Sequence, residues 1–315
     1  MFHRPLLPYD TPHKLKGVRS PKGLEGGSVN KPIYYAPVSH PRLGDELDCP
    51  RRHAIDVYRV APHVWNVGGN DDVCCYLIDS GDGLVLLDTG YRASVYLLID
   101  HIWQAGFDPR GIRKVLLSHW HWDHVNGASY IQGLSGCEIW LSSVDEKLHQ
   151  KWKDDVSELP MAPYEITDTY EFSRPLEIGR LSIETRLVPG HTPGAVAFLF
   201  SDTDESTGRT YRCAMHGGLG VPMMRPETRD KWDITEAMVR QFVSDCEELS
   251  RWHVDIMFPS HVNMGNVIPN IPEDRNDYRT WIAPYAWSDV LRDRKNVVLG
   301  YYPKEFLERG RAHER

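Results

Sequence analysis

The segment "SHWHWDHVNG" carries side chains that are well suited to binding a metal ion. His119, His121, Asp123 and His124 fall within six consecutive positions. In an extended backbone, residues two apart project to the same side, so His119 and His121 can share one ion. Asp123 and His124 come after the expected bend and point in a different direction. The spacing therefore predicts two adjacent metal positions.

Each of these positions needs a further ligand, and three histidines at the ends of expected strands can supply it. They are His191 in "VPGHTPG", His216 in "AMHGG" and His261 in "FPSHVN". Three neutral imidazoles with a water suit zinc, and an Asp/His/His set leaves room for water or substrate. Isolated histidines elsewhere are better explained as surface or core residues; these are His53, His63, His101 and His253.

The first half of the chain predicts a sheet that leads into the histidine cluster. Residues 55–67, 72–80 and 83–90 are rich in Val, Ile, Tyr and Leu and predict three successive strands. Residues 93–106 have the apolar spacing of a helix, and residues 112–120 form a β-rich run that ends at the cluster. The cluster is therefore expected at the C-terminal end of a strand. Trp120 and Trp122 are expected to pack beneath it, and the alternative is that either of them lines the substrate pocket.

The second half repeats this alternation. We expect helices over 127–136, 143–152 (capped at Ser143) and 233–252 (capped at Asp233), and strands over 137–143, 181–191, 195–202, 210–218 and 254–261. Two irregular stretches, 152–172 and 217–233, fall where loops can cover a site and set its specificity.

Composition limits the domain organisation and the class of partner. Residues 1–52 hold eight prolines and predict an extended arm, residues 53–265 the catalytic domain, and residues 266–315 an extension packed on it. The net charge of −8 and the absence of a Lys/Arg cluster argue against nucleic acid and favour a small-molecule substrate. We expect no membrane partner, a cytoplasmic protein, and a homodimer formed through the arm as one option. Six scattered cysteines fit reduced thiols.

The ordered motifs "LLDTG", "SHWHWDHVNG", "VPGHTPG" and "PSH" resemble those of the metallo-β-lactamase superfamily over roughly residues 54–265. The resemblance implies an α/β fold, the four-layer αββα sandwich, with the metal site at one sheet edge. It also implies a ligand set of His119, His121 and His191 for the first metal, and of Asp123, His124 and His261 for the second. Asp88 would be a structural residue that steadies the ligand loops. The cofactors would be two divalent ions, with zinc favoured and manganese or iron as alternatives.

One position departs from the family pattern. Most dinuclear members place a bridging aspartate after the penultimate core strand, where this chain has His216. A neutral imidazole offers one lone pair and cannot bridge two cations. His216 can therefore ligate the second metal alone, act as a proton donor or substrate contact, or pack in the core.

The chemistry expected of this site is hydrolysis by a metal-activated water, with Asp123 as proton acceptor and His216, if free, as proton donor. The main hypothesis is a lactone, ester or lactam hydrolase of the lactonase type, acting on a small apolar or aromatic molecule. The alternatives are thioester hydrolysis, hydrolytic dehalogenation or iron-dependent thiol oxidation on the same fold. A weaker alternative is a non-catalytic binding module.

Overall fold

The structure is a computed structural model that describes residues 50–152, 163–265 and 267–306. Contacts divide the chain into Met1–Lys31 and Pro32–Arg315, and every described residue lies in the second unit. The expected arm therefore lies outside the described residues up to residue 49, as does any dimer contact that it would make. Residues 153–162 of the expected loop at 152–172 also lie outside them.

The first of two mixed sheets contains the strands of the first half of the chain in sequence order. Its strands are β1 (Tyr58–Ala61), β2 (Val64–Asn66), β3 (Tyr76–Asp79), β4 (Leu84–Leu87), β5 (Ile112–Leu116) and β6 (Glu138–Trp140). Neighbours from β1 to β4 pair antiparallel, whereas β5 is parallel to both β4 and β6. The parallel pairs are joined by helices, as parallel connections require.

The second sheet has the order β11-β10-β9-β8-β7. Its strands are β7 (Leu176–Ile178), β8 (Leu181–Leu187), β9 (Val196–Asp204), β10 (Arg209–His216) and β11 (Ile256–Phe258). All neighbours pair antiparallel except β10 and β11, which are parallel and are connected through a helix.

Strands that are covered by helices on one side and by the other sheet on the other side are buried on both faces, and β4 is an example. In β4 all four residues are apolar and buried: Val85 and Leu87 join the core between the sheets, while Leu84 and Leu86 face the outer helices. Successive strand residues point to opposite faces, so a continuous apolar run is what a sheet covered on both sides needs. The same alternation in β10 sends Met215 to the core between the sheets and Ala214 to the helical side.

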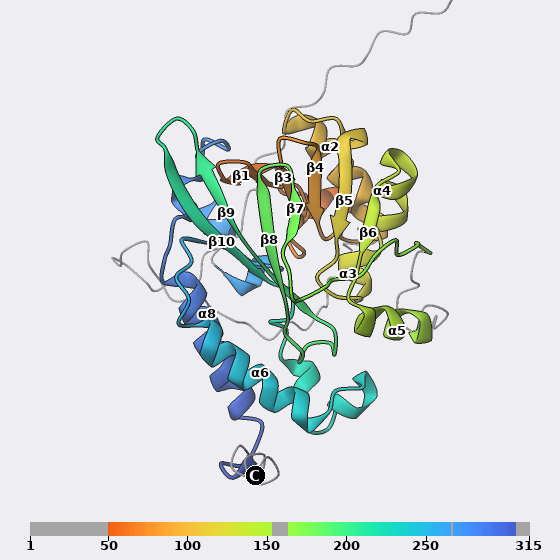
Figure 1. Ribbon diagram of the computed structural model, residues 1–315, viewed down its shortest axis with the longest axis vertical. Helices are drawn as coiled ribbons and strands as arrows, with labels where there is room; N and C mark the ends of the chain where they lie inside the picture. Colours follow the sequence, from red (N-terminus) through yellow and green to blue (C-terminus); the bar gives the residue numbers. More distant parts are fainter. Residues whose placement is uncertain (1–49, 153–162, 266, 307–315) are drawn as a thin grey trace, which may run out of the picture. The chain divides into compact units, whose positions relative to one another are not determined.

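Helices form the two outer layers. On the first sheet pack α2 (Val95–Gln104) and α4 (Ala128–Ser135), and on the second pack α6 (Glu236–Leu249) and α8 (Ala286–Leu299) (Figure 1). Shorter or peripheral helices are α3 (Trp122–Val125), α5 (Ser143–Trp152) and α7 (Val267–Asn270), with 3₁₀ turns at Pro50–His53, Arg92–Ser94, Pro109–Gly111, Pro222–Met224, Arg229–Trp232, Val262–Met264 and Tyr278–Trp281. The expected αββα sandwich is confirmed.

Several boundaries differ from the sequence expectation. Residues 55–67 form the antiparallel pair β1 and β2 rather than one strand, because the chain turns at Pro62 and His63. The cap of α6 is Thr235, whose hydroxyl accepts the Met238 N–H at 3.2 Å, and not Asp233. The hydroxyl that accepts an N–H in the first turn of α5 belongs to Ser142, one residue before the expected Ser143.

The segment after residue 265 contributes more than an appended tail would. Trp287, Val290 and Leu291 of α8 are fully buried in the core that α6 shares with the second sheet. Burying such side chains contributes about 1.5–3 kcal/mol each. This helix therefore completes an outer layer of the sandwich.

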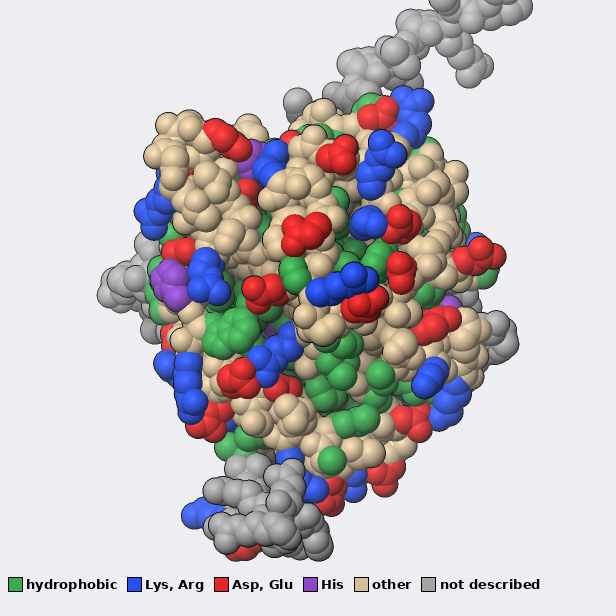
Figure 2. All heavy atoms as spheres, in the orientation of Figure 1, with side chains coloured by type: hydrophobic (Ala, Val, Ile, Leu, Met, Phe, Trp, Pro, Cys, Tyr) green, Lys and Arg blue, Asp and Glu red, His purple; other side chains and the backbone are tan. Residues whose placement is uncertain are grey.

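The described residues show how charge and cysteines are distributed in the fold. No helix in the described ranges is long and apolar enough to cross a membrane. On the face shown in Figure 2, acidic and basic side chains are interspersed, and the described residues form no continuous basic stripe there. The five described cysteines are free and buried.

Candidate metal centre

Ends of strands carry the expected ligands to one region. The turn after β5 holds His119 and His121, and α3, which follows directly, holds Asp123 and His124. His191 lies between β8 and β9, and His261 follows β11 and forms a bridge to Val73. The structure thus brings together every expected ligand except His216.

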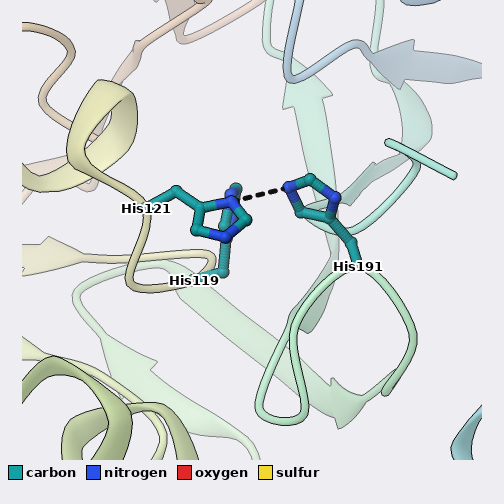
Figure 3. A group of neighbouring side chains, drawn as sticks. All are labelled: His119, His121 and His191. Carbon is teal, nitrogen blue, oxygen red and sulfur yellow. Dashed lines mark hydrogen bonds between the residues drawn. The ribbon is translucent and has the colours of Figure 1, made fainter. Parts of the chain in front are cut away.

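The first group consists of His119, His121 and His191, whose ligand nitrogens lie within 4.8 Å of one another. Figure 3 shows the three rings turned toward one point, with His121 and His191 approaching from opposite sides. The Nδ1 of His121 lies 2.9 Å from the Nε2 of His191. The buried Nε2 of His119 has no hydrogen-bond partner among the described residues. Three imidazole nitrogens in this arrangement fit one cation.

The second group consists of Asp123, His124 and His261. The Nε2 atoms of His124 and His261 are 3.1 Å apart, and the Oδ2 of Asp123 lies 3.5 and 3.4 Å from them. Ligands about 2.0–2.1 Å from a tetrahedral metal are separated by about 3.3 Å, so this triangle has the size of a coordination face. His119 also lies within 4.8 Å of the ligand atoms of Asp123 and His124, so the two groups adjoin.

Two buried carboxylates orient the imidazoles of the second group. The Nδ1 of His124 lies 2.7 Å from Oδ2 of Asp88, and the Nδ1 of His261 lies 3.0 Å from Oδ1 of Asp72. A carboxylate only accepts, so each Nδ1 carries a proton, and in the neutral form of each ring Nε2 presents its lone pair. Asp88 therefore has the supporting position expected of it.

Neutral partners orient two imidazoles of the first group. The Nδ1 of His191 donates to the carbonyl of Gly220 at 2.7 Å, which leaves Nε2 free to bind. The Nδ1 of His119 lies 2.9 Å from Oγ of Ser118, whose hydroxyl donates to Asp88 at 2.7 Å. Asp88 thus supports both groups, the second directly and the first through Ser118.

Electrostatics distinguish the two groups in the metal-free chain. Burial, reinforced by neighbouring imidazoles, lowers the pKa of His119 and His121 well below the usual value and that of His191 to about 3. For His261, burial is outweighed by Asp72 and Asp123, which raise its pKa to about 9. The first group is therefore neutral and ready to bind a cation, whereas a cation must displace a proton at the second.

The donor set itself fits divalent metal ions. Imidazole nitrogens that face one another across about 3 Å must share a proton or bind a cation, because two bare lone pairs would repel. Two such pairs occur here, His121 with His191 and His124 with His261. Imidazole and carboxylate donors accept zinc, manganese or iron.

His216 belongs to neither of the two ligand groups. It ends β10 on the helical side of the second sheet, and its ring packs near Phe242 of α6 and Trp287 of α8, with ring centroids 6.1 and 6.4 Å away. Its Nδ1 accepts the Gly218 N–H at 3.1 Å, and burial lowers its pKa to about 3. This placement differs from the expectation that His216 ligates a metal or donates a proton, and favours the third option, a packing residue.

The two tryptophans of the motif behave differently. Trp120 is buried in the core beneath α2 and α4, as expected. Trp122 is half-buried and packs on Tyr91, with ring centroids 5.2 Å apart. From the loop at 217–233, Trp232 approaches His121 at a centroid distance of 5.7 Å. One aromatic side chain of that loop thus lies beside the first group.

Sequence reasoning missed two carboxylates, Asp72 and Asp145. Asp72 supports His261 and also accepts a hydrogen bond from the Tyr91 hydroxyl. Asp145 is fully buried in the first turn of α5 and contacts the loops of the first group. Neither residue lies in a ligand motif. The sequence shows only that each is an acidic residue close to an apolar run, which does not indicate a role in supporting a ligand.

Comparisons with known proteins agree with this geometry. Residues 68–207 match the family model described as "Metallo-beta-lactamase superfamily". The chain is 28% identical over 153 residues to the hydroxyacylglutathione hydrolase GloC of Haemophilus influenzae, covering 47% of this chain and 68% of that protein. It is 30% identical over 86 residues to the mitochondrial persulfide dioxygenase ETHE1 of Bos taurus, covering 27% of each. The match thus spans about a quarter of the dioxygenase.

Solved structures show the same fold at low sequence identity. The subclass B3 metallo-β-lactamase BJP-1 of Bradyrhizobium japonicum superposes with a TM-score of 0.70 at 16% identity, covering 79% of this chain and 94% of that one. Native FEZ-1 of Legionella gormanii gives 0.71 at 19% identity, covering 81% and 98%. Together the comparisons support a metal-dependent hydrolase as the general class.

Proposed function

Because the chain belongs to the metallo-β-lactamase superfamily, we propose that it is a hydrolase that requires two divalent metal ions, zinc in the first instance, and cleaves a lactone, ester or lactam. The observation that carries the proposal is the pair of adjoining ligand groups, with nitrogens facing across 2.9 and 3.1 Å. When bound, the metal ions would supply Lewis acidity that activates water and polarises a carbonyl group.

The chain's own residues supply the other requirements of hydrolysis. His119, His121 and His191 would hold the first ion, and Asp123, His124 and His261 the second. Asp123 is partly exposed, with 13% of its side chain accessible, and its Oδ2 lies beside the second group. Since it is a carboxylate at the edge of the centre, it is the proposed acceptor of the proton that water loses.

The proposed substrate is small and apolar or aromatic. Trp232 packs on His121 and contacts apolar residues of both outer cores, so it presents an aromatic surface beside the first ligand group. Asp233, which directly follows Trp232, forms an ion pair of 2.5 Å with Lys151 in the C-terminal turn of α5. Aromatic surfaces beside a few polar groups are common in sites for small molecules.

A second candidate function uses the same residues with iron. Asp123, His124 and His261 form a set of two histidines and one carboxylate, which is typical of non-haem iron sites that activate oxygen. Similarity to a persulfide dioxygenase favours thiol oxidation as this alternative, and similarity to a hydroxyacylglutathione hydrolase favours thioester hydrolysis.

Metal analysis followed by a substrate panel separates these functions. The purified protein is loaded with zinc, manganese or iron and assayed with an aryl ester, an aromatic lactone, a chromogenic β-lactam, an acyl-glutathione thioester and a persulfide with oxygen uptake. His121→Ala should abolish the activity while leaving the circular dichroism spectrum unchanged. His253→Ala, which removes an exposed histidine outside both groups, is the matched control. Activity that survives His121→Ala and chelation would refute the proposal.

A further inference from the structure

Asp145 joins the two loops that carry the first ligand group. Its Oδ2 accepts the Trp120 N–H at 3.1 Å and the Thr192 hydroxyl at 2.7 Å, and its Oδ1 accepts the Gly194 N–H at 2.6 Å. The residue is 0% exposed, so all three donors satisfy one carboxylate out of water. Burial raises the pKa of the Asp145 carboxyl to about 7, whereas the three donors favour its ionised form, to which hydrogen bonds are short and strong.

The positions of these donors give the contact its significance. Trp120 lies between His119 and His121, and Thr192 directly follows His191. A single side chain of α5 therefore fixes the backbone beside all three histidines of the first group.

The N-terminal end of α5 packs closely against the loop that carries His191. The Ser142 hydroxyl donates to the Gly194 carbonyl at 2.7 Å and accepts the Asp145 N–H at 3.1 Å. A Cβ atom at position 194 would lie 2.2 Å from Oγ of Ser142 and 2.5 Å from Oδ1 of Asp145. Only glycine leaves room for this approach, so the loop's distance from α5 is set by contact.

We propose that Asp145 is a positioning residue that sets the metal affinity of the first site by holding the His119–His121 turn and the His191 loop in register. The inference rests on the proposed metal centre. The second group has its own supports, since Asp72 and Asp88 contact His261 and His124 directly. Asp145 hydrogen-bonds to neither of those two ligands in the described structure.

The role requires a carboxylate rather than an amide. Asparagine at position 145 can accept on one side only. Its amino group would then face either the Gly194 N–H or the pair formed by the Trp120 N–H and the Thr192 hydroxyl. In the first orientation the His191 loop would lose its Gly194 contact and keep only that of Thr192. In the second the His119–His121 turn would lose its Trp120 contact. Either loss weakens the link between the two loops, while the side-chain volume stays the same.

Zinc titration of the full-length protein, with crystals of the same variants measured for anomalous scattering at each position, tests the proposal. Asp145→Asn should lower zinc affinity at the first site by about 10–100-fold, the usual effect of losing a residue that supports metal ligands, and change the second site less than about threefold. Asp72→Asn is the matched control and should reverse the pattern. Equal losses at both sites, or none, would overturn the role of Asp145.

Thr192→Val covers the case in which Asp145→Asn does not fold. It removes one hydroxyl from the contact at constant size and should produce a smaller loss confined to the first site; unchanged zinc affinity there would also overturn the proposal. The outcome is separate from the proposed reaction. If the wild-type protein binds two zinc ions but hydrolyses none of the panel, the function fails while the role of Asp145 stands.

Discussion

Asp72→Asn should remove a specific pH dependence from the stability of the metal-free protein. Although burial lowers the pKa of His261, the hydrogen bond and charge of Asp72, together with the charge of Asp123, raise it to about 9. In the unfolded chain a histidine has a pKa near ~6.5. The folded protein therefore binds this proton more tightly than the unfolded chain does.

The sign and size of the effect follow from this difference. A raised folded-state pKa adds stability that is fully present below pH ~6.5 and is lost as the pH rises through about 9. The gap between the two pKa values corresponds to about 3 kcal/mol of unfolding free energy. Asp72→Asn removes the main negative charge that raises the pKa of His261, while burial still favours the neutral ring. Most of this pH dependence of the unfolding free energy should therefore disappear.

Urea denaturation of chelator-treated protein from pH 6 to 9.5 measures the effect. The unfolding free energy of the wild type should fall by about 3 kcal/mol more than that of Asp72→Asn over this range. In the unfolded chain the cysteine thiols begin to ionise near the upper end of this pH range. Their contribution to the unfolding free energy is the same in the wild type and in Asp72→Asn, so it cancels in the comparison. Asp71→Asn, which alters the neighbouring carboxylate facing His53 at 3.3 Å, should keep the wild-type slope. Parallel curves for wild type and Asp72→Asn would refute the reasoning.

Three further predictions concern the first ligand group and α6. Gly220→Ala would place a Cβ atom 2.7 Å from Nδ1 and Cε1 of His191, so zinc affinity at the first site should fall by about 10-fold or more in a zinc titration. Trp232→Ala should raise KM for an aryl ester by up to about tenfold and leave KM for a short aliphatic ester almost unchanged; equal changes would exclude an aromatic contact beside His121. Thr235→Ala removes the cap of α6 and should cost about 1 kcal/mol in urea denaturation, with kcat unaffected.

The ligand cluster was predictable because its members are close in the sequence. The spacing of His119, His121, Asp123 and His124 predicted two sets, and the structure places these residues in two adjoining groups. A histidine at the end of a β-rich run occurs at His191, His216 and His261, and the family resemblance assigned His191 and His261 as ligands. Such signals depend only on neighbouring residues, so they can be read from a single sequence.

The supporting carboxylates were not predictable because their contacts are long-range. Asp72 meets His261 across 189 positions, and Asp145 meets Thr192 across 47. Nothing in the residues around either aspartate indicates its partner. The cap of α6 was missed for a different reason: Asp233 and Thr235 are both good caps by residue type, and the backbone of Asp233 is left-handed, with φ of +57°.

His216 shows how strand alternation can correct an argument from motif position. Met215 faces the core between the sheets, so in a regular strand His216 must face the opposite side with Ala214, toward α6 and α8. Since its Nδ1 accepts from the Gly218 N–H, the proton lies on Nε2, and its pKa of about 3 keeps the ring neutral near pH 7. A neutral imidazole on the helical side is a poor proton donor to a leaving group. Without a carboxylate at this position, Asp123 is the one carboxylate among the proposed ligands, and a two-metal centre held by these residues would carry more positive charge than one with a bridging aspartate. That excess favours substrates whose cleavage develops an anion, as ester, lactone and lactam hydrolysis do.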